Sequence, residues 1–198
     1  MTDLHETATN SYAPTIAAAP YVIRAEMSSD IAARESLLDV CFGASRHART
    51  CQRLRDGRLP AEGLAFSVDF EGKLVGTIRL WHVDAGGRAA VMLGPLAVDP
   101  SLRALGIGAA LMKHAIAEAA ARGHGAILLL GDPPYYARFG FTPERMETLA
   151  LPGPFERERL LSLELKAGAL DRARGIILPS GKRVRNTDAE FQPSALAA

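Results

Sequence analysis

One arginine and two glycines lie between an apolar run that ends at Val98 and a long helical pattern. Arg103, Gly106 and Gly108 stand where that helix should begin. The first turn of a helix leaves backbone N–H groups unpaired, and these groups attract phosphate together with the helix dipole. Glycine lets the backbone approach a ligand closely, and arginine adds a fixed positive charge. The segment therefore predicts a pyrophosphate site. The alternative is that both glycines only permit a tight turn and close helix–sheet packing.

A pair of tyrosines follows the next apolar run, residues 126–130. The side chain of Tyr136 keeps its proton at neutral pH and could donate it to a departing thiolate. The alternative role for Tyr136 is that of a core aromatic residue with a hydrogen-bonded hydroxyl. Tyr135 is a second candidate acid. Adjacent residues on a helix point in different directions, so we expect only one of the two to serve.

Three elements must position these residues. We expect a strand over Ala89–Val98 that is interrupted at Gly94-Pro95, a helix over Leu105–Arg122 and a buried strand over Ala126–Leu130. Proline within a strand removes a ladder hydrogen bond, which predicts a bulge or a place where the strand leaves its neighbour. The three elements form one β-α-β crossover, so the two strands should be parallel neighbours.

The rest of the chain predicts a mixed, mostly antiparallel sheet with helices packed on it, in the α/β (α+β) class. A helix is expected over Ile31–Phe42 with Asp30 as its N-cap, and a short helix or ordered loop over His47–Arg55. The remaining expected elements are strands at Tyr21–Arg24, Leu64–Phe70, Leu74–Val83, Leu160–Leu165 and Gly175–Leu178, and a short helix at Pro133–Phe139. We expect one domain over residues 20–179, with tails at 1–19 and 180–198.

Composition excludes several classes of protein. The net charge of +1 on 198 residues gives no bulk electrostatic reason for binding nucleic acid or an anionic membrane. No apolar run is long enough to span a membrane, and the N-terminal residues do not have the pattern of a signal peptide. Cys41 and Cys51 form neither a disulfide framework nor a metal-ligand pattern. The sequence predicts a cytoplasmic protein without a metal.

Two of these segments carry a resemblance to a known family. Arg103–Ala109 matches the Q/R-x-x-G-x-G/A signature of the GNAT superfamily of acyl-CoA-dependent N-acetyltransferases, and Tyr136–Phe141 matches its Y-x-x-x-G-F segment. The wider stretch Gly131–Phe141 resembles the YhbS-type branch of that superfamily. The resemblance is strongest over residues 90–142 and extends over about 21–178. It implies a GNAT-type mixed sheet in which the crossover carries the cofactor loop.

The resemblance also implies a role for each matching residue, with acetyl-CoA as the co-substrate. Backbone groups of Leu96, Ala97 and Val98 would bind the pantetheine arm and the acetyl group. The pyrophosphate would lie against Arg103, Ala104, Leu105, Gly106, Ile107, Gly108 and Ala109. Tyr136 would protonate the thiolate of coenzyme A as it leaves.

The general base is less clear from the sequence. The expected central strand Ala89–Val98 contains no acidic residue, and the preceding strand ends with His82 and Asp84. His82 has the more suitable unperturbed pKa, ~6.5, so it is the candidate base. The alternatives are that His82 is a surface residue and that the amine loses its proton to water.

The acceptor has no readable motif. We expect a primary amine on a small molecule or a protein, bound by the loops around residues 43–60 and 142–160. The basic segment Arg46–Arg49 could line a site for an anionic acceptor, or it could be a solvated loop. The late strands could pair across a homodimer.

The sequence thus predicts an N-acetyltransferase that moves an acetyl group from acetyl-CoA to a primary amine by direct attack in a ternary complex. One alternative is a non-catalytic acyl-CoA-binding or regulatory module on the same fold. Another is an interaction protein that has lost the cofactor, although the glycine pair Gly106/Gly108 argues against it.

Overall fold

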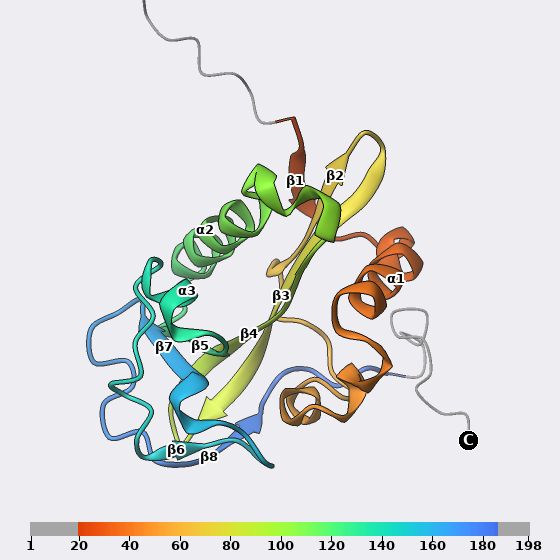
Figure 1. The fold of residues 1–198 in the computed structure, drawn as a ribbon. Helices are drawn as coiled ribbons and strands as arrows, with labels where there is room; N and C mark the ends of the chain where they lie inside the picture. Colours follow the sequence, from red (N-terminus) through yellow and green to blue (C-terminus); the bar gives the residue numbers. More distant parts are fainter. Residues whose placement is uncertain (1–19, 186–198) are drawn as a thin grey trace, which may run out of the picture.

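The computed structural model describes residues 20–185. Its centre is an eight-stranded sheet in which β1, β2, β3, β4, β5 and β7 lie side by side, while β8 pairs with the end of β3 and with β6 (Figure 1). The strands are β1 (Val22–Ala25), β2 (Ala65–Phe70), β3 (Lys73–Ala85), β4 (Ala89–Val98), β5 (Ala126–Leu130), β6 (Leu149–Ala150), β7 (Leu160–Glu164) and β8 (Gly175–Pro179). Most neighbours are antiparallel, as expected.

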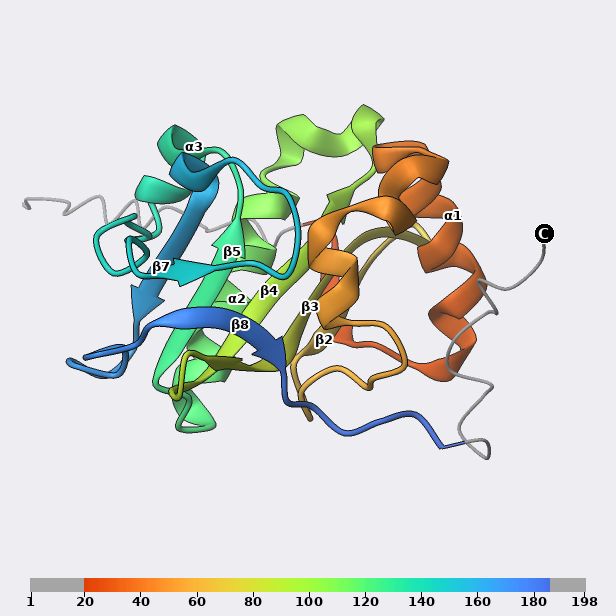
Figure 2. The same cartoon turned by 90° about the horizontal axis from the view of Figure 1, so that it is seen from below.

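Helices cover both faces of the sheet. The helices are α1 (Ile31–Phe42), α2 (Ile107–Ala121) and α3 (Pro133–Ala137), with 3-10 turns η1 (Ser28–Asp30), η2 (Ala44–Ala48), η3 (Thr50–Leu54), η4 (Pro100–Leu105) and η5 (Arg157–Arg159). On β4, Val91 packs in the same core cluster as Ile107 of α2, whereas Met92 packs with Leu54 of η3. Successive strand residues point to opposite faces, so α2 and η3 lie on opposite faces (Figure 2).

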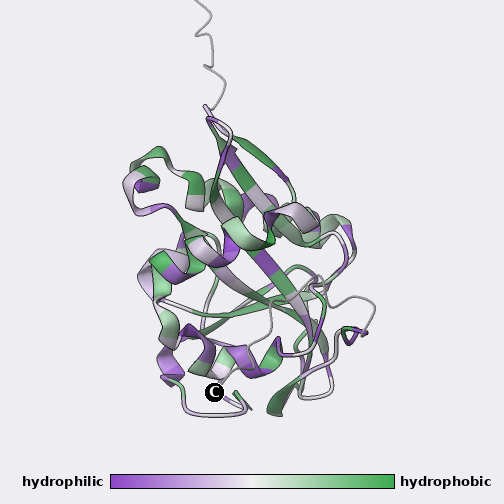
Figure 3. Cartoon of the chain, turned by 90° about the vertical axis from the view of Figure 1, so that its right-hand side faces the viewer, coloured by the Kyte–Doolittle hydropathy of each residue, from purple (hydrophilic) through white to green (hydrophobic). Residues whose placement is uncertain are grey.

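Hydrophobic and hydrophilic residues alternate along both the strands and the helices (Figure 3). The pattern matches helices that bury one side against a sheet. Among the described residues, no helix has the length and apolar character needed to cross a bilayer.

The predicted crossover is confirmed. β4 and β5 are parallel, with Val91 opposite Ile127 and Met92 opposite Leu128, and α2 connects them. The bulge expected at Gly94-Pro95 is also present, because the register between β3 and β4 shifts there. Beyond Met92 the two parallel strands separate.

Several element boundaries differ from the expectation. Helix α2 begins at Ile107, since residues 100–105 form the 3-10 turn η4 and Gly106 adopts a left-handed conformation with φ 72°. The two-residue strand β6 was not predicted. Asp30 occupies the N-cap position of α1, as expected, but its side chain makes no capping hydrogen bond to the helix. It accepts hydrogen bonds from Arg24 instead.

The ends of the predicted domain lie partly outside the described residues. Residues 1–19 and 186–198 of the expected tails lie outside the described residues. Residues 180–184 continue to form backbone hydrogen bonds with the domain. Ser180 N donates to the carbonyl oxygen of His82, and Leu59 N donates to that of Lys182. Val184 N donates to the carbonyl oxygen of Gly57 at 2.9 Å. The contacts of the domain therefore reach past residue 179.

Candidate active site

The separation of β4 from β5 opens the floor of a cavity. Residues 93–96 of β4 and Leu129 and Leu130 of β5 line a cavity of about 700 Å³. The carbonyl oxygen of Gly94 points away from β5, because it accepts a hydrogen bond from Trp81 Nε1 on β3 at 2.6 Å. The bulge is thus held against β3 while the opposite edge of β4 faces the cavity.

Tyr136 of α3 reaches this cavity. Its ring packs beside Gly131, where a Cβ would overlap the ring, and against Phe141 with ring centroids 6.0 Å apart. Burial raises the pKa of Tyr136 to about 12, and neighbouring Tyr135 acts in the same direction. The hydroxyl therefore stays protonated across the physiological range.

Tyr135 points elsewhere. Its hydroxyl oxygen lies 3.3 Å from the position that a Cβ on Gly108 would take, and Arg138 stacks on its ring at 4.1 Å. Tyr135 is not among the residues that line the cavity. The structure thus separates the two tyrosines: Tyr136 faces the cavity and Tyr135 faces the glycine segment.

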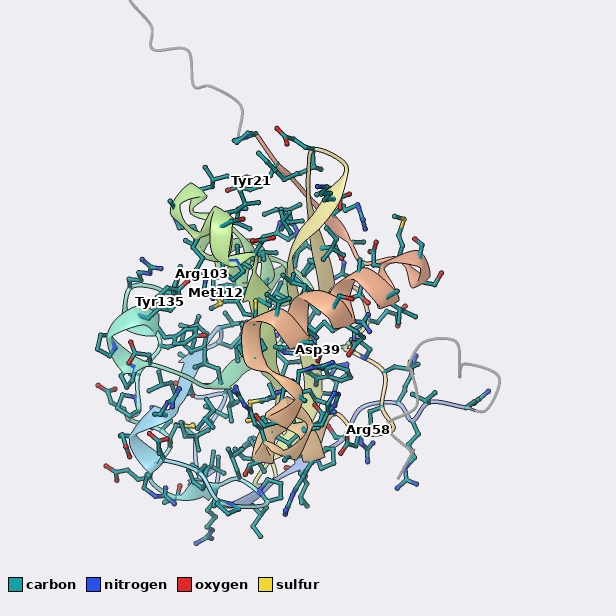
Figure 4. All side chains as sticks on the ribbon, turned by 45° about the vertical axis from the view of Figure 1, so that its right-hand side comes forward. Tyr21, Asp39, Arg58, Arg103, Met112 and Tyr135 are labelled. Atoms are coloured by element: carbon teal, nitrogen blue, oxygen red, sulfur yellow. The ribbon has the colours of Figure 1, made fainter. Side chains whose placement is uncertain are left out.

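The glycine segment forms the start of α2. The first helical bond of this turn runs from Ala110 N to the carbonyl oxygen of Gly106 at 3.0 Å. The N–H groups of residues 107–109 precede that bond and belong to the unpaired first turn. Arg103 is exposed and makes no ion pair with any residue in the described range. Figure 4 shows Arg103 and Tyr135 on the same side of the molecule. These are the features of an anion site.

His82 lies apart from this arrangement. Leu80 packs in the cluster that contains α2, so strand alternation places His82 on the α2 face of β3. Its ring lies 5.3 Å from that of His124, and it does not line the cavity. Asp84 accepts a hydrogen bond from Gly87 N in the turn between β3 and β4. The structure therefore brings neither candidate base to Tyr136.

The lining of the cavity is rich in arginine. It includes Arg46, Arg49, Arg53 and Arg55, and also Arg159, whose Nε donates to the carbonyl oxygen of Gly131 beside the Tyr136 ring; Glu156 is the carboxylate of this lining. The sequence drew attention to the segment Arg46–Arg49 but not to Arg53, Arg55 or Arg159. The recurrence of arginine between residues 46 and 58 was the available signal. Within residues 20–185, no group of three or more His, Cys, Asp or Glu side chains could hold a metal ion.

Comparison with known proteins defines the class. The profile of the acetyltransferase (GNAT) family matches residues 31–141, which is more than half of the chain. The chain therefore belongs to the acetyltransferase (GNAT) family, and by class it is an acyltransferase. This confirms the family and the fold predicted from Arg103–Ala109 and Tyr136–Phe141.

Particular relatives support the same branch. The chain is 32% identical over 122 residues to the uncharacterized N-acetyltransferase YhbS of Escherichia coli K12, covering 61% of this chain and 72% of the relative. The crystal structure of E. coli YhbS in complex with CoA aligns with a TM-score of 0.71 at 28% identity, over 84% of this chain and 93% of that chain. A GNAT family acetyltransferase from Brucella melitensis in complex with acetyl-CoA has a TM-score of 0.61 at 23% identity, over 88% and 100% of the two chains. The second match supports the fold.

Proposed function

We propose that this protein transfers an acetyl group from acetyl-CoA to a primary amine by direct attack in a ternary complex. The observation that carries the proposal is the position of Tyr136, which lines the cavity where β4 and β5 separate and whose hydroxyl stays protonated. The solved complex of the related YhbS with CoA supports a coenzyme A thioester as co-substrate.

The start of α2 would hold the pyrophosphate. A Cβ on Gly108 would lie 3.3 Å from the Tyr135 hydroxyl and 3.6 Å from Val98 Cγ2, so a larger side chain would fill the space in front of the free N–H groups. Residues 103–109 would cradle the phosphates, and the unpaired edge of β4 at residues 96–98 would receive the pantetheine arm. N–H groups near Val98 would polarise the thioester carbonyl.

Tyr136 would act on the sulfur. The amine nitrogen attacks the carbonyl carbon, a C–N bond forms and the C–S bond breaks. The thiolate that leaves takes the proton of the Tyr136 hydroxyl. A pKa of about 12 makes the phenol a weak acid that donates a hydrogen bond first and releases its proton only as charge develops on sulfur.

The amine must also lose a proton before it attacks. A catalytic role for His82 would require its ring to reach the cavity, which it does not line. We therefore propose that the amine loses its proton to water, which is the second possibility that the sequence left open. The product is an amide. As it forms, the nitrogen loses a second proton, which passes through solvent to the deprotonated Tyr136 and restores its hydroxyl.

Ligand-induced stabilisation tests the cofactor site. A ligand that binds only the folded state adds ~2.7 kcal/mol to the free energy of unfolding at a hundredfold excess over its Kd. We expect acetyl-CoA to raise the Tm of the wild type, to raise it less in Gly108→Ala and not to raise it in Gly108→Trp. The Tm of each variant without ligand is the control for folding. No shift of the wild type at millimolar acetyl-CoA would refute the proposal.

A further inference from the structure

We infer that the amine acceptor is a small molecule carrying an anionic group, a carboxylate or a phosphate, and that Arg49, Arg53 and Arg55 bind that group. The inference rests on the proposed acetyl transfer, since it names the substrate class for the same cavity. It concerns the part of the cavity lining formed by Arg46, Arg49, Arg53 and Arg55, called here the arginine wall.

The charge on this wall is strongly unbalanced. Five arginines line the cavity, against a single carboxylate side chain, Glu156. Glu156 lies at 3.5 Å from Arg159 and is 65% exposed, so it offsets that one charge only in part. Arg46 is already paired, with Glu35 at 2.6 Å and Asp39 at 2.7 Å. The remaining positive charge belongs to the other three arginines.

Two of these lie at the rim without a carboxylate partner. Arg49 stacks over the ring of Phe42 at 5.2 Å, and Arg53 Nη1 donates to the carbonyl oxygen of Pro152 at 2.6 Å. Neither forms an ion pair with any residue between 20 and 185. Both contacts orient a guanidinium while leaving its charge uncompensated, and such groups bind carboxylate or phosphate in fixed geometry.

The third lies deeper, against the bulge of β4. A terminal nitrogen of Arg55 is 3.9 Å from the position of a Cβ on Gly94, and its Nε is shielded from solvent without a hydrogen-bond partner in the described structure. An unsatisfied N–H on a buried guanidinium is destabilising, and a bound anion would remove part of that cost. We therefore expect the anionic group of the acceptor to bind at Arg55.

The cofactor's own phosphates should bind elsewhere. The start of α2 lies with the core cluster of Ile107, whereas Leu54, next to Arg55, belongs to the cluster on the opposite face of the sheet. The cavity that contains the arginines also contains Tyr136 and residues 93–96. One acceptor could thus place its amine near the thioester and its anion against the arginines. A volume of about 700 Å³ suits a small molecule.

The thiol of Cys51 allows the charge of this cavity to be measured without a known acceptor. Cys51 lines the cavity and is one of two free cysteines in the described residues, so a Cys41→Ser background leaves a single thiol there. It would be labelled in parallel with an anionic reagent, 2-sulfonatoethyl methanethiosulfonate, and a cationic one, 2-(trimethylammonium)ethyl methanethiosulfonate. Each forms a mixed disulfide and releases methanesulfinate. Burial raises the pKa of Cys51, but this slows both reagents alike and cancels in the ratio of their rates.

We expect the anionic-to-cationic rate ratio at Cys51 to exceed that of free 2-mercaptoethanol by on the order of tenfold at low salt, and to fall with salt. Arg53→Gln and Arg55→Gln should bring it towards the free-thiol value. Arg145→Gln, which removes an exposed arginine outside this cavity, should not change it. A ratio equal to or below that of the free thiol overturns the inference. So does a thiol that neither reagent reaches, because a cavity that admits an acceptor must admit a reagent of similar size.

Two further measurements identify the anionic group and separate its site from that of the cofactor. Methyl phosphate and acetate, added separately, should slow anionic labelling if they occupy the arginine wall, and the more effective of the two indicates phosphate or carboxylate. The affinity for acetyl-CoA, measured by Tm shift, should fall in Arg103→Gln and stay within about twofold in Arg53→Gln. An equal loss in both variants would assign the arginines to the cofactor's phosphates and overturn the inference. If the wild type does not bind acetyl-CoA, the proposed acetyl transfer is refuted, whatever the labelling ratio at Cys51 is.

Discussion

Tyr135 and Tyr136 are adjacent, yet their side chains lie in different regions of the site. Tyr136 faces the cavity with a pKa raised to about 12 by burial, and Tyr135 faces the glycine at the start of α2. The short helix α3 produces this separation, because successive side chains on a helix diverge by about 100°. The sequence could name the pair, but only the placement of α3 distinguishes its members.

The two tyrosines can be told apart by kinetics. Tyr136→Phe removes the proton donor and keeps the ring, so we expect kcat to fall by about 10²-fold while the KM for acetyl-CoA changes little. Tyr135→Phe is the matched control, and its kcat should stay within about twofold while any effect falls on the KM for acetyl-CoA. Steady-state assays of coenzyme A release measure both. An unchanged kcat in Tyr136→Phe would show that Tyr136 is not the general acid.

Among the arginines of the site, some positions could be predicted from the sequence and others could not. Arg103 could be placed because a glycine signature fixes its position relative to a helix. Arg53 and Arg55 could not be placed, since the 3-10 turn η3, which contains Arg53 and ends before Arg55, has no periodic pattern. These arginines reach the cavity only because of how distant segments pack. His82 was named for its pKa, but a ring nitrogen acts only where the backbone brings it, and β3 turns this ring towards His124.

At the scale of elements, the end of β5 and the start of α3 form one unit. Gly131 follows β5 directly, and the ring of Tyr136 occupies the space that any side chain at position 131 would need. The tyrosine is therefore positioned by a residue that carries no side chain of its own.

This dependence predicts the effect of a single methyl group. Gly131→Ala should displace the Tyr136 ring and lower kcat by at least about tenfold, because a catalytic group that shifts by about 1 Å loses much of its effect. Gly125→Ala is a control with a milder steric conflict away from the site, since its Cβ would lie 3.0 Å from that of Ala169, whereas a Cβ on Gly131 would overlap the Tyr136 ring. The control should lose stability in urea without a matching loss of kcat. Equal kcat in both variants would contradict the prediction.

Long elements with a clear pattern were predicted well, and short ones were not. The β4–α2–β5 crossover follows from a glycine-ended helix between two apolar runs. Strand β6 has two residues, Leu149 and Ala150, and is a strand only because β8 lies beside it. Such pairing depends on distant segments, and no local pattern encodes it.

For the whole molecule, a buried cluster of charges centres on Glu26, which follows β1. Its carboxylate accepts hydrogen bonds from Arg34 of α1 and Arg79 of β3, and the side chains of all three are less than a tenth exposed. Arg79 stacks on Trp81, which in turn bonds to Gly94 at the bulge. The cluster links one end of the sheet to the floor of the active site.

Removing this carboxylate should destabilise the fold. Glu26→Gln would leave the buried guanidinium of Arg79 without an ion-pair partner in the described residues, and that of Arg34 with Glu35 alone. Removing one partner of such a buried pair should cost about 3–5 kcal/mol in the free energy of unfolding. Glu118→Gln is the control, because its pair with Arg122 is exposed and should contribute at most about 0.5 kcal/mol. Urea denaturation at neutral pH measures both variants. A loss for Glu26→Gln no larger than that of the control would show that the buried cluster adds little.

The separation of β4 from β5 also gives the molecule an internal edge. A strand in the middle of a sheet normally has its amides protected from exchange with solvent deuterons by both neighbours, but from Leu93 onward β4 has a strand partner on one side only. Amides that point towards the gap should exchange rapidly in the free protein. If the pantetheine arm fills the gap, acetyl-CoA should slow their exchange selectively, while amides that face β3 stay slow in both states. The cofactor would then complete the sheet, and deuterium uptake at residues 93–98 would report its arrival.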